Sequence, residues 1–179
     1  AGRDELVPIR LVLELRHPAE LAVARDRAEQ PRRLSVSGHV AHPGLYELPL
    51  GTPLRQVIEH AGGVLGGRAL KAVIPGGMSM PILPAGMLDV PMANEFLRER
   101  KTMLGTGGIM VMDDTTCMVR VAQVITYFFR DESCGQCVPC RVGTVRQEEV
   151  LARLASGRPN GSAAEELAFT LASGVEYMD

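Results

Sequence analysis

The sequence lacks the residue types on which most nucleic-acid and membrane proteins depend. It has no tryptophan, three tyrosines and four phenylalanines among 179 residues, too few for a base-stacking platform or an aromatic membrane belt. No run approaches the roughly 18 apolar residues of a membrane span. Basic residues number 19 and acidic residues 21, and no basic run could neutralise several phosphates. We therefore expect neither a nucleic-acid partner nor direct membrane insertion.

Cysteine is also scarce, and three of the four cysteines lie between positions 134 and 140. The N-terminal residues are charged throughout and lack the apolar stretch of a signal peptide, so this crowding predicts reduced thiolates that hold a metal rather than disulfides. Cys134, Cys137 and Cys140 form a Cys-x2-Cys-x2-Cys motif. This spacing suits neighbouring corners of an iron-sulfur cube, whereas zinc sites usually use two separated Cys-x2-Cys pairs. Iron-sulfur is the favoured interpretation; a zinc knuckle and a chance cluster of structural thiols are the alternatives.

The residues around these thiols have expected supporting roles. Gly135 lets the backbone approach a sulfide, to which its free N–H can donate, and Pro139 stiffens the turn. Arg141 places a cation beside an anionic cluster. Ser133, Gly135 and Arg141 are therefore the candidates for the surroundings of the cluster.

The number of thiols in the motif is one short, because a 4Fe-4S cube takes four ligands. The remaining cysteine, Cys117, lies at the start of a predicted helix that ends near Arg130. At about 1.5 Å per residue, this helix separates Cys117 from the cluster loop by roughly 20 Å. We expect Cys117 to be a buried small hydrophobe and the fourth ligand to lie outside this sequence.

The whole chain predicts an α+β fold, a β-grasp (ubiquitin-like) domain followed by a C-terminal helical bundle that carries the iron-sulfur loop. A hairpin, a helix capped by Thr52 and further short strands follow one another in the order of a β-grasp unit. Three helices are expected near the C-terminus, over about 118–130, 143–155 and 162–172. The predicted segments are an N-terminal segment and linker at 1–33, the β-grasp domain at 34–86, a connecting segment and strand at 87–112, and the helical cluster domain at 113–179.

At the cysteine motif the sequence resembles a known family. Residues 132–143 look like the cluster signature of the NADH-binding flavoprotein subunit of respiratory complex I, which the diaphorase subunits of NAD-dependent formate dehydrogenases and NAD-reducing hydrogenases share. Residues 105–113 resemble the strand before that signature, and residues 34–86 are similar to the family's soluble-ligand-binding (SLBB) β-grasp domain. Val138 and residues 142–149 look closer to the formate-dehydrogenase type than to complex I.

The resemblance implies an electron-transfer role. In the family a 4Fe-4S cluster takes electrons from reduced FMN and passes them to clusters in partner subunits, including a cluster-carrying small subunit. FMN and NAD(H) bind to an N-terminal domain with glycine-rich loops, and no such loop precedes Leu34, so this chain alone is not expected to oxidise NADH. The family's fourth cluster cysteine falls just beyond Asp179. A cytoplasmic location, peripheral to the inner face of the membrane within a complex, is also implied.

Two other classes of function stay open, a zinc-stabilised structural or interaction module and an inert fragment with a β-grasp ligand-binding domain. No catalytic residue is expected, since no nucleophile arrangement is visible. His39 and His42 are expected to be solvated turn residues with no acidic partner nearby. The glycines at 105–108 predict a structural turn, because no Lys-Ser/Thr follows them as in a phosphate loop.

Overall fold

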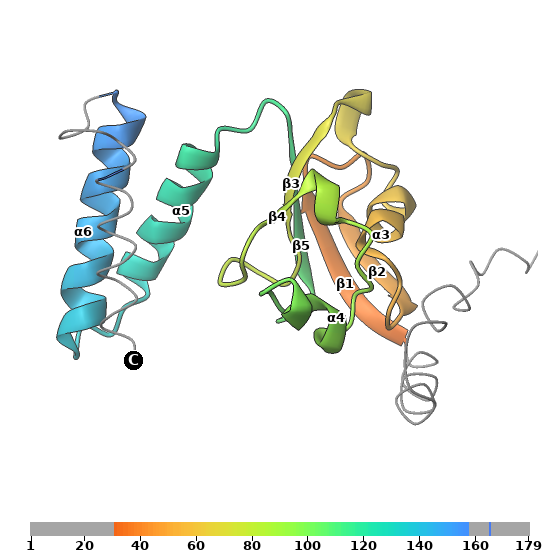
Figure 1. Cartoon of the computed structure of the whole chain (residues 1–179), viewed down its shortest axis with the longest axis horizontal. Helices are drawn as coiled ribbons and strands as arrows, with labels where there is room; N and C mark the ends of the chain where they lie inside the picture. The colour runs from red at the N-terminus through yellow and green to blue at the C-terminus, as the bar shows by residue number, and fades with distance from the viewer. Residues whose placement is uncertain (1–30, 158–164, 166–179) are drawn as a thin grey trace, which may run out of the picture. The chain divides into compact units, whose positions relative to one another are not determined.

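The computed structural model describes residues 31–157 and 165. The elements predicted before residue 31, and the helix predicted over 162–172 apart from Glu165, lie outside the described residues. The chain divides between Asp113 and Asp114 into two compact units, called unit 1 and unit 2 and described one at a time (Figure 1). A search of the described helices finds none that is long and apolar enough to cross a membrane.

Unit 1 is built on a five-stranded mixed sheet with the strand order β2-β1-β5-β3-β4. Strand β1 pairs in parallel with β5 and antiparallel with β2, and strand β3 pairs antiparallel with both β5 and β4. The strands are β1 (Pro31–Gly38), β2 (Gly44–Pro49), β3 (Leu70–Ile74), β4 (Leu83–Pro84) and β5 (Gly108–Asp113). Short helical elements connect them: α3 (Leu54–His60), η1 (Leu65–Gly67), η2 (Ala85–Met87) and α4 (Asn94–Glu99).

The core of unit 1 follows from the alternation of apolar residues along the strands. Leu34 and Val36 of β1 are buried while Ser35 between them is exposed, as a strand with one covered face requires. Helix α3 buries its apolar side against this core. The predicted cap by Thr52 is wrong, because the N-cap is Pro53 and the Thr52 hydroxyl donates to the Pro49 carbonyl oxygen at 2.7 Å.

Strand β5 lies in the middle of the sheet, between β1 and β3. The prediction placed this strand in a connecting segment, after a β-grasp domain that ended at residue 86. Its residues Ile109, Val111 and Met112 are buried, so the sheet of unit 1 includes a strand from beyond the predicted domain. The boundaries of the four segments given in the sequence analysis otherwise stay a prediction.

The glycines before β5 form the predicted structural turn. A Cβ added to Gly105 would lie 2.2 Å from the Gly76 carbonyl oxygen, and one added to Gly76 would lie 2.4 Å from the Leu104 carbonyl oxygen. Two backbone turns therefore touch at a distance that only glycine permits. The Thr106 N–H donates to the Gly76 oxygen at 3.1 Å and joins them.

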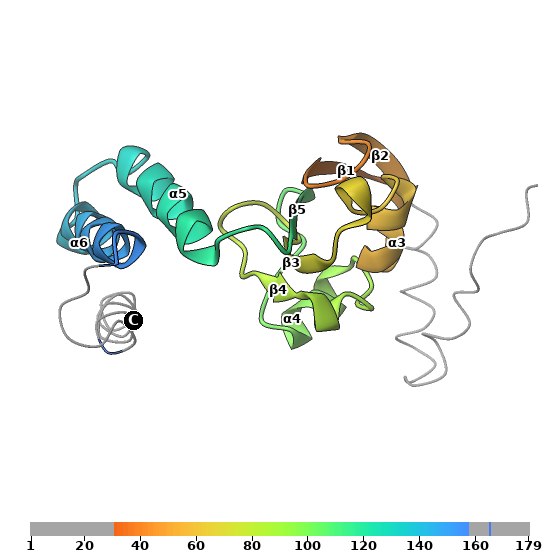
Figure 2. The ribbon, with the colours of Figure 1, turned by 90° about the horizontal axis from the view of Figure 1, so that it is seen from above.

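Within residues 114–157, unit 2 has two helices that pack together, α5 (Met118–Asp131) and α6 (Val138–Ala155) (Figure 2). The bounds of α5 agree with the sequence pattern, but α6 begins at Val138 and not at Gly143. Pro139 in its first turn suits a helix start, because the N–H that proline lacks would have no helical partner there. The cysteine motif therefore runs into the helix instead of preceding it.

Candidate metal centre

The three cysteines of the motif occupy the connection from α5 to α6. Cys134 lies in the loop, Cys137 is the N-cap of α6 and Cys140 lies in its first turn. All three are exposed, and none forms a disulfide. The first helical hydrogen bond runs from the Arg141 N–H to the Cys137 carbonyl oxygen at 3.0 Å. The thiols therefore surround a helix start, where unpaired N–H groups and the helix dipole favour negative charge.

The thiols of Cys137 and Cys140 interact, and their pKa values shift in opposite directions. Interaction with the backbone and the side chain of Cys140 lowers the pKa of the Cys137 thiol, and the Arg141 charge lowers it further. The hydrogen bond to Cys137 in turn raises the pKa of Cys140, as do the charges of Cys137 and Cys134. Of this pair, Cys137 is thus more disposed than Cys140 to be a thiolate, the form that binds metals.

The donor set fits a cluster that takes one further ligand from outside the motif. Among the residues that the structure describes, no group of three or more His, Cys, Asp or Glu side chains already surrounds a common metal position. The charges of Cys134 and Cys137 both disfavour the thiolate of Cys140, so three thiolates together need a cation between them. Three soft sulfur ligands suit iron-sulfur clusters or zinc and do not suit magnesium or calcium.

Ser133 and Arg141, two of the predicted supporting residues, form hydrogen bonds with the backbone N–H and C=O of the third, Gly135. The Gly135 N–H donates to the Ser133 hydroxyl at 3.2 Å, and Arg141 donates to the Gly135 carbonyl oxygen at 3.0 Å. The expectation of a free Gly135 N–H is therefore wrong in this structure. Gly135 has a φ of 69°, and no atom lies within 4 Å of a Cβ added there. Its backbone conformation, and not crowding, explains the glycine.

Cys117 departs from its prediction in one respect. It is exposed, not buried, and it is the N-cap of α5. The 14 residues of α5 lie between it and the cluster loop, which at about 1.5 Å per residue separates them by roughly 20 Å. Its exclusion from the ligand set stays a prediction.

His39 has an acidic partner, contrary to the expectation from the sequence. Its Nδ1 lies 3.0 Å from an Asp113 carboxylate oxygen, and Arg68 lies 3.6 Å from the other oxygen. Asp113 has a side-chain exposure of 5%. The partner was missed because it lies at the end of β5, 74 positions along the chain. His42 is exposed, as expected for a turn, and its carbonyl oxygen accepts from the Tyr46 hydroxyl.

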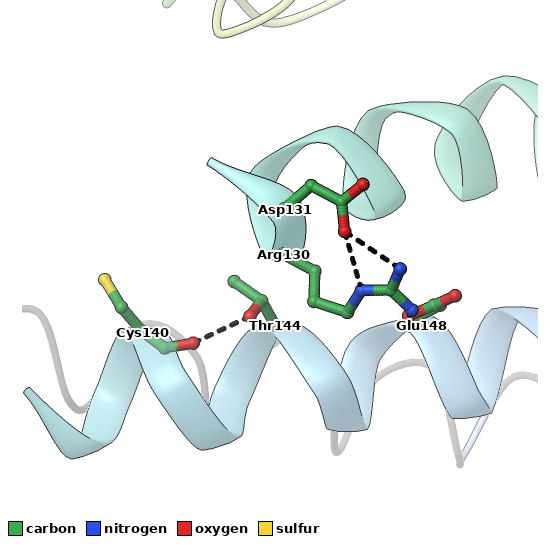
Figure 3. Close-up of polar contacts among 5 residues, drawn as sticks. All are labelled: Arg130, Asp131, Cys140, Thr144 and Glu148. Carbon is green, nitrogen blue, oxygen red and sulfur yellow. Dashed lines mark hydrogen bonds and ion pairs between the residues drawn. The ribbon is translucent and has the colours of Figure 1, made fainter. Parts of the chain in front are cut away.

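A cation at the end of α5 was also missed. Arg130 donates to Asp131 at 2.9 and 3.2 Å and to Glu148 of α6 at 2.5 Å (Figure 3). Its guanidinium carbon lies 4.5 Å from the centre of the Tyr127 ring. These interactions raise the pKa of Arg130, first through the hydrogen bond to Asp131. No spacing rule connects residues 130 and 148, because they lie on different helices.

A thiol-rich helix start of this kind defines an iron-sulfur binding region, and comparison with known families agrees. Residues 120–174 match the NADH-ubiquinone oxidoreductase-F iron-sulfur binding region, and residues 33–83 match the SLBB domain. An NADH-quinone oxidoreductase F subunit of Rhizobium meliloti is 47% identical over 81% of this chain and 35% of its own length. The corresponding F subunit of Streptomyces coelicolor is 43% identical over 74% of this chain and 30% of its own length.

A solved structure of similar fold is an NAD+-reducing [NiFe]-hydrogenase in the H2-reduced state, with a TM-score of 0.68 and 36% identity over 80% of this chain and 24% of that one. The chain thus contains an iron-sulfur binding region and an SLBB domain and is similar to NADH-quinone oxidoreductase F subunits, as its motifs predicted. It spans about a third of the length of the curated relatives it matches. None of these three proteins is named as a formate dehydrogenase, so the preference for that type has no support from them.

Proposed function

We propose that this chain is the electron-relay part of an NADH-oxidising or NAD-reducing flavoprotein subunit. A 4Fe-4S cluster bound by Cys134, Cys137 and Cys140 carries the electrons, with the fourth ligand from outside the motif. The observation that carries the proposal is the position of three exposed thiols around the start of α6, within a segment that matches an iron-sulfur binding region.

The chain's own residues place the thiols and adjust their charge. Cys137 is the N-cap of α6 and Cys140 lies in its first turn, so the start of this helix sets their relative position. Cys140 and the Arg141 charge lower the pKa of the Cys137 thiol. Arg141 fixes the Gly135 peptide and keeps a positive charge beside the loop. When bound, the cluster supplies one-electron transfer, and positive charge and N–H groups around it favour the more negative, reduced form.

The rest of the proposed role concerns the longer protein. FMN and NAD(H) bind outside the described residues, and the electrons continue to other subunits of an oxidoreductase complex, including a cluster-carrying small subunit. The support is the similarity to F subunits and the name of the solved NAD+-reducing hydrogenase. A location in the cytoplasm, peripheral to a membrane complex, belongs to the same proposal.

The finer fold assignment is part of the proposal as well. The strand order β2-β1-β5-β3-β4, the parallel β1–β5 pair and the helix α3 after the first hairpin support a β-grasp fold for unit 1. The packed pair of α5 and α6 supports a helical bundle for unit 2.

Metal analysis tests the proposal. Anaerobic reconstitution with iron and sulfide, with a small thiol present to fill the open coordination position, is expected to give a brown protein that contains iron and acid-labile sulfide. Cys134→Ala, Cys137→Ala and Cys140→Ala should each abolish the colour, and Cys117→Ala serves as the matched control that keeps it. Zinc without sulfide in protein from cells grown with both metals would instead establish the structural-module alternative.

A further inference from the structure

Arg130 connects the two helices that border the thiol loop. Its guanidinium contacts Asp131 beside it, Glu148 on α6 and the face of the Tyr127 ring. The side-chain exposures of Arg130 and Glu148 are 33% and 25%, so the pair is partly shielded from water. A shielded pair with several contacts is worth more than an exposed pair on one helix.

Glu148 lies on the same side of α6 as Cys140. The residues Cys140, Thr144 and Glu148 follow one another at intervals of four, which places them along one face of a helix. The Thr144 hydroxyl donates to the Cys140 carbonyl oxygen at 2.7 Å, and Figure 3 shows the three side chains in a row. The contact between Arg130 and Glu148 therefore fixes the rotation of α6 relative to α5. It thereby fixes the direction in which the first turn, with Cys140, faces.

Arg130, the partner of Glu148, lies at the end of α5, where the thiol loop begins. Arg130 and Asp131 are the last two residues of α5, and Cys134 follows three positions after Asp131. The Arg130–Glu148 pair thus links the residue next to one end of the loop with the helix face that carries Cys140 at the other end.

We propose that the Arg130–Glu148 pair is a clamp that positions Cys134 relative to Cys140 and so slows the loss of the bound cluster. Closing a loop around a metal costs conformational entropy, and this cost falls when the two ends are already held at their bound separation. Arg130 is a positioning residue, because it acts through the helices and not through contact with the cluster. The inference rests on the proposed function, since it concerns the same cluster.

Iron release tests the clamp in the full chain reconstituted as above. We expect Arg130→Gln and Glu148→Gln each to speed the transfer of iron to a ferrous chelator about tenfold, which corresponds to about 1.4 kcal/mol in the barrier. The double variant should release iron no faster than either single variant, because the two changes remove one interaction. Arg146→Gln is the matched control: its pair with Glu149 lies on α6 alone, with side-chain exposures of 70% and 45%, and it should leave the rate unchanged.

A second readout uses the metal-free protein. Hydrogen exchange of the amides at 133–137 should be faster in both clamp variants, while far-UV circular dichroism at room temperature stays that of the wild type. If Arg130→Gln loses helix content, Glu148→Gln carries the test, because it leaves the Arg130 contacts with Asp131 and Tyr127 in place.

The outcomes separate the two proposals. A wild-type chain that takes up no iron and sulfide overturns the proposed function. A wild-type chain that takes them up, together with clamp variants that release iron at the wild-type rate, overturns the clamp and leaves the proposed function standing. Equal acceleration by Arg146→Gln also overturns the clamp, because it would make the effect one of general charge.

Discussion

The central position of β5 makes a strong prediction about what unit 1 needs in order to fold. A chain that ends at residue 107 keeps β1 to β4 but lacks β5, which pairs with both β1 and β3. It loses three buried hydrophobic side chains, Ile109, Val111 and Met112, together with the buried Asp113. At about 1.5–3 kcal/mol for each hydrophobic side chain, the loss is about 5–9 kcal/mol, before the ladder hydrogen bonds are counted. The whole free energy of unfolding of a protein domain is about 5–15 kcal/mol.

We therefore expect residues 1–107 to be unfolded and residues 1–113 to be folded. Because the chain has no tryptophan, far-UV circular dichroism melts and the dispersion of amide signals in NMR spectra are suitable assays. The longer chain should show a cooperative thermal transition and dispersed signals, and the shorter chain neither. A cooperative transition in residues 1–107 at a similar temperature would refute the reasoning, because the sheet would then not depend on its central strand.

Three further predictions concern single residues. Asp113→Ala removes a buried carboxylate that pairs with a histidine and an arginine and should lower the free energy of unfolding of unit 1 by about 2 kcal/mol in urea denaturation; Glu47→Ala, at an exposed pair, should change it by less than about 0.5 kcal/mol. Gly135→Ala places a side chain at a φ of 69°, which costs about 1–2 kcal/mol, so the cluster should be lost faster while unit 1 unfolds as before; unchanged retention would contradict this. In the metal-free protein the pKa of Cys137 is lowered and that of Cys140 is raised, so Cys137 forms its thiolate at lower pH than Cys140. Mass spectrometry should find Cys137 alkylated before Cys140 near neutral pH, and the reverse order would contradict these opposite shifts.

Local signals predicted much of this fold, and contacts distant in sequence explain the misses. The alternation at Leu34 and Val36 and the bounds of α5 were readable because each lies within one element. The role of β5 was not, because a strand's own residues do not say which strands will flank it. The His39–Asp113 pair was missed for the same reason, since its two residues meet only across the sheet.

The site was predictable in its ligands and not in its geometry. The spacing of Cys134, Cys137 and Cys140 indicates thiolate chemistry without any structure. The start of α6 was placed too late, because Gly143 was taken as a helix boundary although a glycine inside a helix costs only about 1 kcal/mol. Proline in the second position and the unpaired N–H groups of the first turn together favour a helix that begins within the motif.

This helix start divides the three thiols into two kinds. Cys137 and Cys140 are fixed by α6 itself, as its N-cap and as a residue of its first turn. Cys134 lies outside the helix, and its position depends on the contacts of the loop, those of Ser133 and Arg141 with the Gly135 peptide. The position of Cys134 relative to α6 therefore depends on contacts that the helix itself does not make. For this reason the contacts that matter most for holding a cluster are expected between side chains that are not ligands, at the end of α5 and on α6, such as Arg130 and Glu148.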